Sequence, residues 1–294
     1  MNVNLFELFY NVAQFSSFSE ASEKLFISQP AISLQIQKLE KQVGVQLFNR
    51  LPNGISLTPE GQNFLHYVEN GINNFKDGFL YLKNINGLKY GKIRIGTSAT
   101  ICKNLLVPII AEFHKIYPQI EIQIISGQSE DLVSQLDYGQ IDVLFMTWYK
   151  EDGTYQTQKV FEIQDVIIGD KNMYEKTKQG ISLAELENMN FIVQTKQSST
   201  RMLMDKVFEK NNFNPKVFTE VVSFDLIAHL VGAGLGVGYS TKQFIDDLLA
   251  KQIVYVLNLK QQMSKRNIDM ITKKVAIPNV IIEEFKKVVE KFKQ

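Results

Sequence analysis

The sequence is poor in several residue types that carry chemistry, and its 294 residues have a net charge of only +1. The single cysteine, Cys102, excludes an internal disulfide and a cysteine-based zinc site, which agrees with a reducing compartment. No apolar run approaches the ~18 residues that a membrane-spanning helix needs. The first basic residue is Lys24, so the amino terminus lacks the charged start of a secretory signal. We therefore expect a soluble, cytoplasmic protein with no membrane partner.

Signatures of catalysis are also missing. The three histidines, His66, His114 and His229, lie far apart and have no metal-ligand spacing. No Gly-x-Gly-x-x-Gly or Walker pattern joins a strand to a helix. We therefore expect a protein that binds no metal and no cofactor and that is not an enzyme. A solute-binding protein, or an enzyme with dispersed catalytic residues, remains the alternative.

The hydrophobic pattern changes near residue 86. Helical periodicity dominates before this point, whereas short strands alternate with helices from Gly91 onward. A hydrophobic content of 45% is sufficient for more than one core. We predict four segments: a small helical domain with a β-wing (1–58), a linker helix (59–86), a hinge (87–91) and a larger α/β domain (92–294).

The segment from Ser28 to Gly44 predicts a helix with two chemically different faces. Ile32, Ile36, Leu39 and Val43 form an apolar stripe. The opposite side and its flanks carry Gln29, Pro30, Ser33, Leu34, Gln37 and Lys38. Amides and hydroxyls can pair with base edges, and lysines can approach phosphates, so this face suits DNA. The alternative is an ordinary solvated face. A second helix is expected before this one, beginning at Glu20 with Ser19 as its N-terminal cap.

A short hairpin should follow this helix. Asn53-Gly54 is a strong turn signal between two short apolar strands, and a hairpin after a helix-turn-helix is a wing. Thr58 then caps the next helix, with Pro59 at its first position.

At these residues the sequence resembles the LysR-type transcriptional regulators. The resemblance rests on Phe18-Ser19-Glu20-Ala21-Ser22, Ser28-Gln29-Pro30-Ala31-Ile32-Ser33, Leu47-Phe48-Asn49-Arg50 and Leu57-Thr58-Pro59-Glu60-Gly61. It implies that Gln29, Pro30, Ser33 and Leu34 enter the major groove, and that Arg50, Asn53 and Thr58 contact the DNA backbone. Many members have a basic residue where Leu34 stands, so apolar contact with a thymine methyl could replace one polar contact. Gln37 and Lys38 complete the predicted DNA-binding set.

The linker helix carries an apolar seam of nearly heptad spacing, made of Phe64, Val68, Ile72, Phe75, Phe79 and Leu82. Such a seam favours pairing with a second helix, and the alternative is packing against its own domain. The resemblance implies a homodimer through this helix, further assembly to a homotetramer, a roughly palindromic double-stranded operator and RNA polymerase at the promoter.

The remaining chain predicts two α/β lobes with mostly parallel sheets. We expect lobe 1 at about 92–161 and 266–294, and lobe 2 at about 162–265. The resemblance implies a fold like that of periplasmic binding proteins, with a small-molecule effector between the lobes.

Loops beyond the carboxyl ends of the predicted strands are rich in hydroxyls and have no acidic residue, which suits a small anion. The predicted effector-binding residues are Ser98, Ala99, Thr100, Gln128, Ser129, Thr147, Ser198, Ser199, Thr200, Arg201 and Ser223. The segment Lys196 to Arg201 looks closest to regulators of sulfur or carbon assimilation that sense small anions. Cys102, near the start of a helix, could be a reactive thiol or a packed one.

Overall fold

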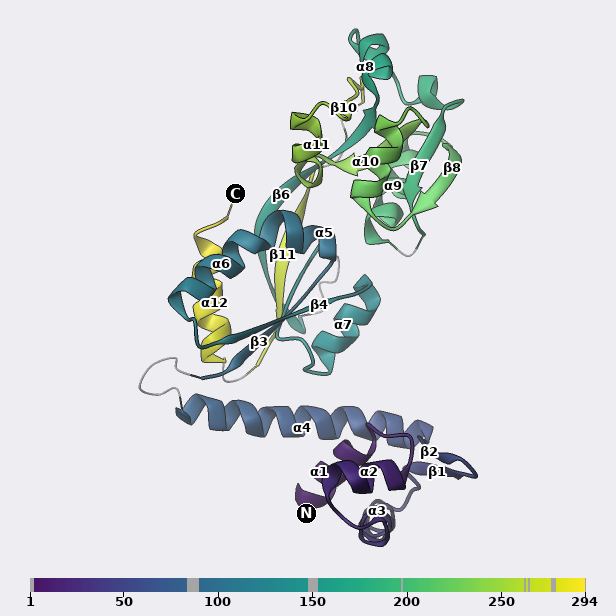
Figure 1. Ribbon diagram of the computed structural model, residues 1–294. Coiled ribbons are helices and arrows are strands. Elements are labelled where there is room, and N and C mark those ends of the chain that lie inside the picture. The colour runs from purple at the N-terminus through teal and green to yellow at the C-terminus, as the bar shows by residue number, and fades with distance from the viewer. Residues whose placement is uncertain are drawn as a thin grey trace. The chain divides into compact units, whose positions relative to one another are not determined.

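The computed structural model describes residues 3–83, 90–147, 153–196, 198–261, 263, 265–275 and 279–293. The chain divides into two compact units, Met1–Gly87 and Leu88–Gln294, which are described separately (Figure 1). Residues 84–89, which contain much of the predicted hinge at 87–91, lie outside the described residues.

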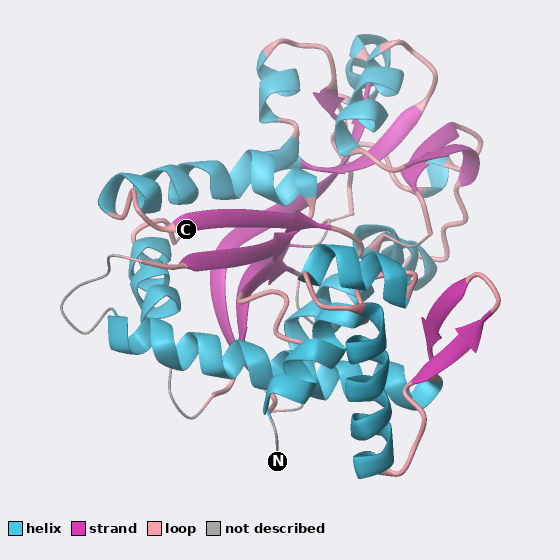
Figure 2. Cartoon of the chain, turned by 60° about the horizontal axis from the view of Figure 1, so that its bottom comes forward, coloured by secondary structure: helices cyan, strands magenta, loops and turns pink. Residues whose placement is uncertain are grey.

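The first unit is a helical domain with one hairpin. Its elements are α1 (Val3–Val12), α2 (Phe18–Leu25), α3 (Gln29–Val43), β1 (Phe48–Leu51), β2 (Gly54–Leu57) and α4 (Pro59–Lys83). Figure 2 shows the hairpin as a separate pair of antiparallel strands. Phe9, Ile32 and Leu39 are completely buried in the core between the helices. The predicted winged helix-turn-helix is therefore present.

Two local predictions in this unit were wrong. Ser17, and not Ser19, caps α2, because the Ser17 hydroxyl accepts a hydrogen bond from the Glu20 backbone N–H. Phe18 begins the helix and packs its ring edge-on against Phe48, which leaves Ser19 exposed in the first turn. Val43, placed on the buried stripe of α3, is 37% exposed because it is the last residue of the helix.

The second unit consists of two lobes that share one sheet. The first lobe contains β3 (Lys92–Thr97), α5 (Ala99–Ile101), a π-helical turn (Cys102–Leu106), α6 (Val107–Ile116), β4 (Glu121–Ser126), α7 (Ser129–Asp137), β5 (Val143–Met146) and α12 (Val280–Glu290). The second lobe contains α8 (Lys171–Thr177), a 3-10 turn (Ala184–Leu186), β7 (Asn190–Gln194), α9 (Ser199–Lys210), β8 (Lys216–Val221), α10 (Phe224–Gly232), β9 (Val237–Thr241), a 3-10 turn (Lys242–Phe244), α11 (Asp246–Ala250) and β10 (Tyr255–Val256).

Two long strands, β6 (Tyr155–Gly169) and β11 (Lys265–Lys273), run between the lobes (Figure 1). The strand order is β4-β3-β5-β11-β6-β9-β7-β8, with β10 also paired to β6. Pairing is parallel around β3 and β7, but β5–β11, β11–β6 and β6–β9 are antiparallel. The prediction of mostly parallel sheets was therefore wrong at the centre, where the chain crosses between the lobes.

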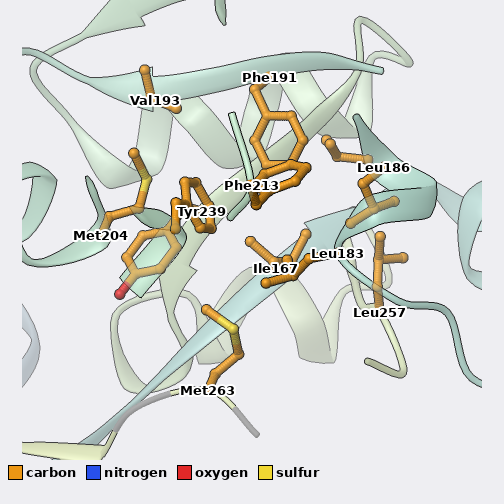
Figure 3. Packing of buried hydrophobic residues seen from close by; sticks show 12 residues of the cluster. Ile167, Leu183, Leu186, Phe191, Val193, Met204, Phe213, Tyr239, Leu257 and Met263 are labelled. Carbon is orange, nitrogen blue, oxygen red and sulfur yellow. The ribbon is translucent and has the colours of Figure 1, made fainter. Parts of the chain in front are cut away.

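Each lobe has its own aromatic core. In the first, Phe285 of α12 packs edge-on against Phe113 and Phe145. In the second, Phe191 of β7 packs edge-on against Phe213, and the Tyr239 hydroxyl lies at the margin of the apolar cluster (Figure 3). None of the helices in the described ranges combines the length and the hydropathy of a membrane-spanning segment.

Candidate functional site

The outer face of α3 carries the side chains that the sequence assigns to DNA. Ile32, Ile36 and Leu39 face the core, so the residues between them face solvent. Gln29, Pro30, Leu34, Gln37 and Lys38 are exposed, and Ser33 is half-buried. Leu34 is 68% exposed, which places a large apolar group among polar neighbours where it can reach another molecule.

The hairpin begins beside this helix, where the Phe48 N–H donates to Glu40 at 3.2 Å, and it is also bonded to the segment before α2. Its turn consists of Pro52 and Asn53, since Gly54 already belongs to β2 and pairs with Leu51. Gly54 has φ +147°, and a Cβ at this position would lie 2.3 Å from the Ser16 carbonyl oxygen. The Ser16 carbonyl oxygen also accepts a 2.8 Å hydrogen bond from the backbone N–H of Ile55. Glycine is therefore required for the hairpin to approach this closely.

Arg50 and Thr58, both predicted to contact the DNA backbone, have different environments. Arg50 is exposed, and its guanidinium lies 5.9 Å from the Phe18 ring centroid, in range of a cation–π contact. Thr58 is only 7% exposed. Its hydroxyl donates to the Gln46 carbonyl oxygen at 2.8 Å and accepts from the Gly61 N–H at 2.9 Å. The Thr58 hydroxyl therefore caps the start of α4.

Helix α4 contains two consecutive apolar segments in different environments. Val68 is buried, and Phe64 and Ile72 pack against the core of the first unit. Further along, Phe79 and Leu82 are 68% and 61% exposed. Packing against its own domain is therefore confirmed for the beginning of the helix, whereas the end presents apolar side chains to solvent.

In the second unit, a buried arginine that the sequence analysis missed joins the two lobes. Arg266 of β11 is 10% exposed and pairs with Asp165 of β6, which is 1% exposed. Its Nε atom lies 3.1 and 3.0 Å from the two carboxylate oxygens. The Thr241 hydroxyl of β9 donates to the same carboxylate at 3.1 Å. The pair is therefore a nearly dry, hydrogen-bonded unit between the crossing strands.

The same guanidinium contacts hydroxyls from both lobes. Nη1 donates to Thr147 Oγ1 at 2.8 Å, at the end of β5 in the first lobe. Nη2 donates to Thr200 Oγ1 at 3.3 Å, in the first turn of α9 in the second lobe, and to Thr241 Oγ1 at 2.9 Å. Two of the predicted effector-binding residues, Thr147 and Thr200, are thus brought together around one side chain.

Other predicted effector residues serve as helix caps or first-turn residues. Ser98 accepts from the Ile101 N–H at 3.2 Å, and Ser198 donates to Gln194 Oε1 at 2.6 Å while accepting from the helix start. Gln128 and Ser223 occupy cap positions without a side-chain cap bond. Ala99 is exposed, whereas Thr100 and Ser129 are half-buried. The side chain of Ser199 is not among those that the structure describes.

Arg201, predicted to bind an anion, is already neutralised. It is 7% exposed, its Nε donates to Asp205 at 2.8 Å, and its Nη1 donates to Glu220 at 3.0 Å and to the Gln194 carbonyl at 2.7 Å. Although burial alone would lower the pKa of Arg201, the hydrogen bonds to the two carboxylates raise it. This arginine therefore ties α9 to β7 and β8.

The predicted loops contain no acidic residue, but Asp165 of β6 adds a buried carboxylate to the interlobe region through its pair with Arg266. Burial, followed by the nearby Asp165 carboxylate, raises the pKa of Tyr239, so this phenol stays neutral. At the edge of the same region, Lys103 and Asp225 form an exposed 2.7 Å ion pair between the π-helical turn and α10.

Burial raises the pKa of the Cys102 thiol, which favours a packed thiol over a reactive one.

Within the described part of the chain, no group of three or more His, Cys, Asp or Glu side chains is arranged to hold a metal ion. The geometry instead defines a class of protein. A winged helix-turn-helix with an exposed polar recognition face precedes a two-lobed α/β domain that has a polar cluster between its lobes.

Comparison with known proteins gives the family. Residues 3–62 match "Bacterial regulatory helix-turn-helix protein, lysR family", and residues 86–292 match "LysR substrate binding domain". The chain belongs to the LysR family of DNA-binding transcriptional regulators, and it is a regulator rather than an enzyme, as the sequence analysis predicted.

Three similar proteins illustrate this membership. The transcriptional regulator CysL of Bacillus subtilis is 24% identical over 271 residues, covering 92% of this chain and 91% of that protein. A full-length OxyR variant from Pseudomonas aeruginosa has the same fold, with a TM-score of 0.77 at 19% identity, covering 99% of this chain and 94% of that one. Full-length CbnR complexed with its target DNA gives a TM-score of 0.70 at 18% identity over 99% of each chain.

Proposed function

We propose that this regulator reads DNA through the outer face of α3 and its wing. The proposed contacts are Gln29, Pro30, Ser33, Leu34, Gln37, Lys38, Arg50 and Asn53. The supporting observation is that six of these eight side chains come from the side of α3 opposite the buried residues Ile32, Ile36 and Leu39. The DNA complex of the structurally similar CbnR is consistent with this proposal.

The test is binding of the purified full-length chain to a duplex from its own promoter region. Affinity should fall with salt, with a log–log slope of about −0.9 per phosphate neutralised. Gln29→Ala together with Ser33→Ala should remove sequence preference while thermal stability is retained. Binding that ignores salt and unlabelled specific competitor would contradict the proposal.

We propose a second copy of the chain as the partner of the exposed end of α4. Phe75, Phe79 and Leu82 recur at spacings of four and three residues, which is the seam of a two-helix coiled coil. Two wings joined in this way would read a roughly palindromic operator, and a homotetramer and RNA polymerase at the promoter would complete the assembly. Phe79→Glu should lower the sedimenting mass, whereas Tyr67→Glu, an exposed residue on another side of α4, should not.

We propose that the effector is a small anion held between the lobes by Thr147 and Thr200. The observation that carries this proposal is that Arg266 donates to both hydroxyls. A guanidinium cannot accept a hydrogen bond, so each threonine oxygen accepts and keeps its own O–H hydrogen for donation. In the described part of the chain, neither hydroxyl has another hydrogen-bond partner. Two donors, one from each lobe, would suit a sulfate, phosphate or carboxylate.

Thermal shift with sodium sulfate, phosphate and citrate, against chloride at equal ionic strength, tests this proposal. A ligand at 100 times its dissociation constant adds about 2.7 kcal/mol to stability. Thr147→Val and Thr200→Val should each abolish the shift produced by the active anion. Thr272→Val, a buried threonine on the same strand as Arg266, should leave it unchanged. Equal shifts in all variants would show that the site is misplaced, and no shift with any anion would contradict the anionic class.

A further inference from the structure

Ser19 and Gln29 are joined by a hydrogen bond between α2 and α3. The Ser19 hydroxyl donates to Gln29 Oε1 at 3.1 Å. Gln29 belongs to the proposed DNA-reading face, so a role for this bond in recognition rests on that proposed function. An amide oxygen that already accepts a hydrogen bond leaves the two N–H groups of Nε2 for a different partner.

We propose that Ser19 is a positioning residue that holds the Gln29 amide with its nitrogen toward the DNA. In this orientation Gln29 donates, and it recognises an acceptor on the major-groove edge, such as N7 or O6 of guanine, N7 of adenine or O4 of thymine. It does not accept from the amino groups of adenine or cytosine. A glutamine free to rotate would offer both its oxygen and its nitrogen, and would discriminate less between bases.

Ser19 can act in this way because the chain around it is fixed. The Ser16 carbonyl accepts the 2.8 Å bond from β2, and the Ser16 N–H and hydroxyl donate to Glu20 at 3.0 and 2.7 Å. The hydrogen bonds from Ser16 lower the pKa of Glu20, so this carboxylate stays charged and keeps accepting. The Ser17 cap and the half-buried Phe18 ring hold the first turn of α2. An exposed serine on such a rigid segment has a defined hydroxyl position.

The same segment, Ser16–Ser19, also positions the wing. The Phe18 ring contacts the Arg50 guanidinium, while the neighbouring Ser19 holds Gln29. One short stretch of chain thus contacts a base-reading side chain and a side chain proposed to contact phosphate. Since neither Phe18 nor Ser19 is among the proposed DNA contacts, their effect on recognition would be indirect.

The test begins with the wild-type full-length chain, which selects a duplex from a randomised pool. Affinities of wild type, Ser19→Ala and Ser19→Thr are then measured on this duplex and on its single-base variants. Ser19→Ala should lower the preference at one base pair of each half-site by about three- to tenfold, the worth of one ordinary hydrogen bond. Ser19→Thr keeps the hydroxyl and should retain the preference. Ser134→Ala, which changes an exposed serine bonded to Glu130 within α7, is the matched control.

Two further variants separate positioning from a general structural effect. In a Gln29→Ala background, Ser19→Ala should have no additional effect on base preference, because the side chain that it orients is gone. Gln29→Glu retains an oxygen for Ser19 but presents a second oxygen in place of the N–H groups, so it should lose the preferred base and shift toward cytosine.

The outcomes distinguish this inference from the function on which it rests. A wild-type chain that enriches no duplex overturns the proposed DNA binding and the inference with it. Normal binding with an unchanged base preference in Ser19→Ala overturns the inference alone. The same holds if Gln29→Glu preserves the original preference, because the amide oxygen would then face the DNA.

Discussion

Replacing Arg266 with methionine should strongly destabilise the second unit. The guanidinium is 10% exposed and its partner Asp165 is 1% exposed, so the change leaves a buried carboxylate that keeps the hydrogen bond from Thr241 but has lost its cation. Breaking such a pair from one side costs about 3–5 kcal/mol, because the remaining charge has lost its compensation. This exceeds the median ~0–1 kcal/mol of exposed ion pairs.

Urea unfolding followed by tryptophan fluorescence provides the assay. The single tryptophan, Trp148, lies outside the described residues but belongs by sequence to the second unit, so its signal reports on that unit. With a slope of about 2–3 kcal/mol per molar urea, the midpoint should fall by about 1–2 M. Lys265→Met is the matched control, since this neighbour on β11 forms an ion pair in which both side chains are more than half exposed.

Asp165→Asn in the Arg266→Met background should recover most of the lost stability, because the buried charge is removed. Two results would refute the view that Asp165 and Arg266 compensate each other. One is a loss below ~1 kcal/mol in the free energy of unfolding of Arg266→Met, and the other is an Arg266→Met/Asp165→Asn variant no more stable than Arg266→Met.

Further predictions concern single positions. Phe26 is 95% exposed with φ +56°, so Phe26→Asn should stabilise the first unit by about 0.5–1 kcal/mol in thermal melts monitored by circular dichroism, and a loss would contradict this. Thr58→Ala should cost about 1–2 kcal/mol in the same melts, and Thr58→Ser much less, since it keeps the cap. Lys103→Met should cost less than ~1 kcal/mol in urea unfolding, and high salt should erase the difference. Hydrogen bonding from Lys287 lowers the pKa of Glu284. The stabilising contribution of this carboxylate is therefore present above the unfolded-state pKa and is lost as pH falls through the lower folded-state pKa. Glu284→Gln should therefore reduce the loss in the free energy of unfolding that accompanies acidification.

Local signals were sufficient for most of the first unit. Periodicity over Ser28 to Gly44 predicted both faces of α3, and Gly44 ends the helix in the left-handed conformation that the sequence indicates. The error at Ser19 arose because three serines precede Glu20, and only tertiary packing of Phe18 decides which of them is the cap. Thr58 matched both a capping signal and a family resemblance, and the structure shows the capping role.

Pairing between strands that are distant in sequence explains why the Asp165–Arg266 pair of the second unit was not predicted. The amino-terminal half of β6 is rich in polar residues, and its partner β11 lies about a hundred residues further along the chain, as in the Asp165–Arg266 pair. Within the sequence, Lys265-Arg266 resembles an exposed basic pair. Alternation along β11 turns one of these side chains to solvent and the other toward Asp165, and this outcome depends on a strand register that no local pattern specifies.

The near-zero net charge of the chain understates its attraction to DNA, because some of its carboxylates are engaged within the fold. Residues 1–88 contain six Lys and Arg against seven Asp and Glu, a net charge of −1. Two of these acids are engaged within the fold, since Glu40 accepts from the backbone N–H groups of Leu47 and Phe48, and Glu20 accepts from Ser16. A carboxylate that binds backbone donors opposes DNA less than its formal charge implies, because those donors partly balance it. Lys38 and Arg50 remain exposed on the reading face. With so few cations per subunit, affinity should depend on the paired subunit more than on the charge of the chain.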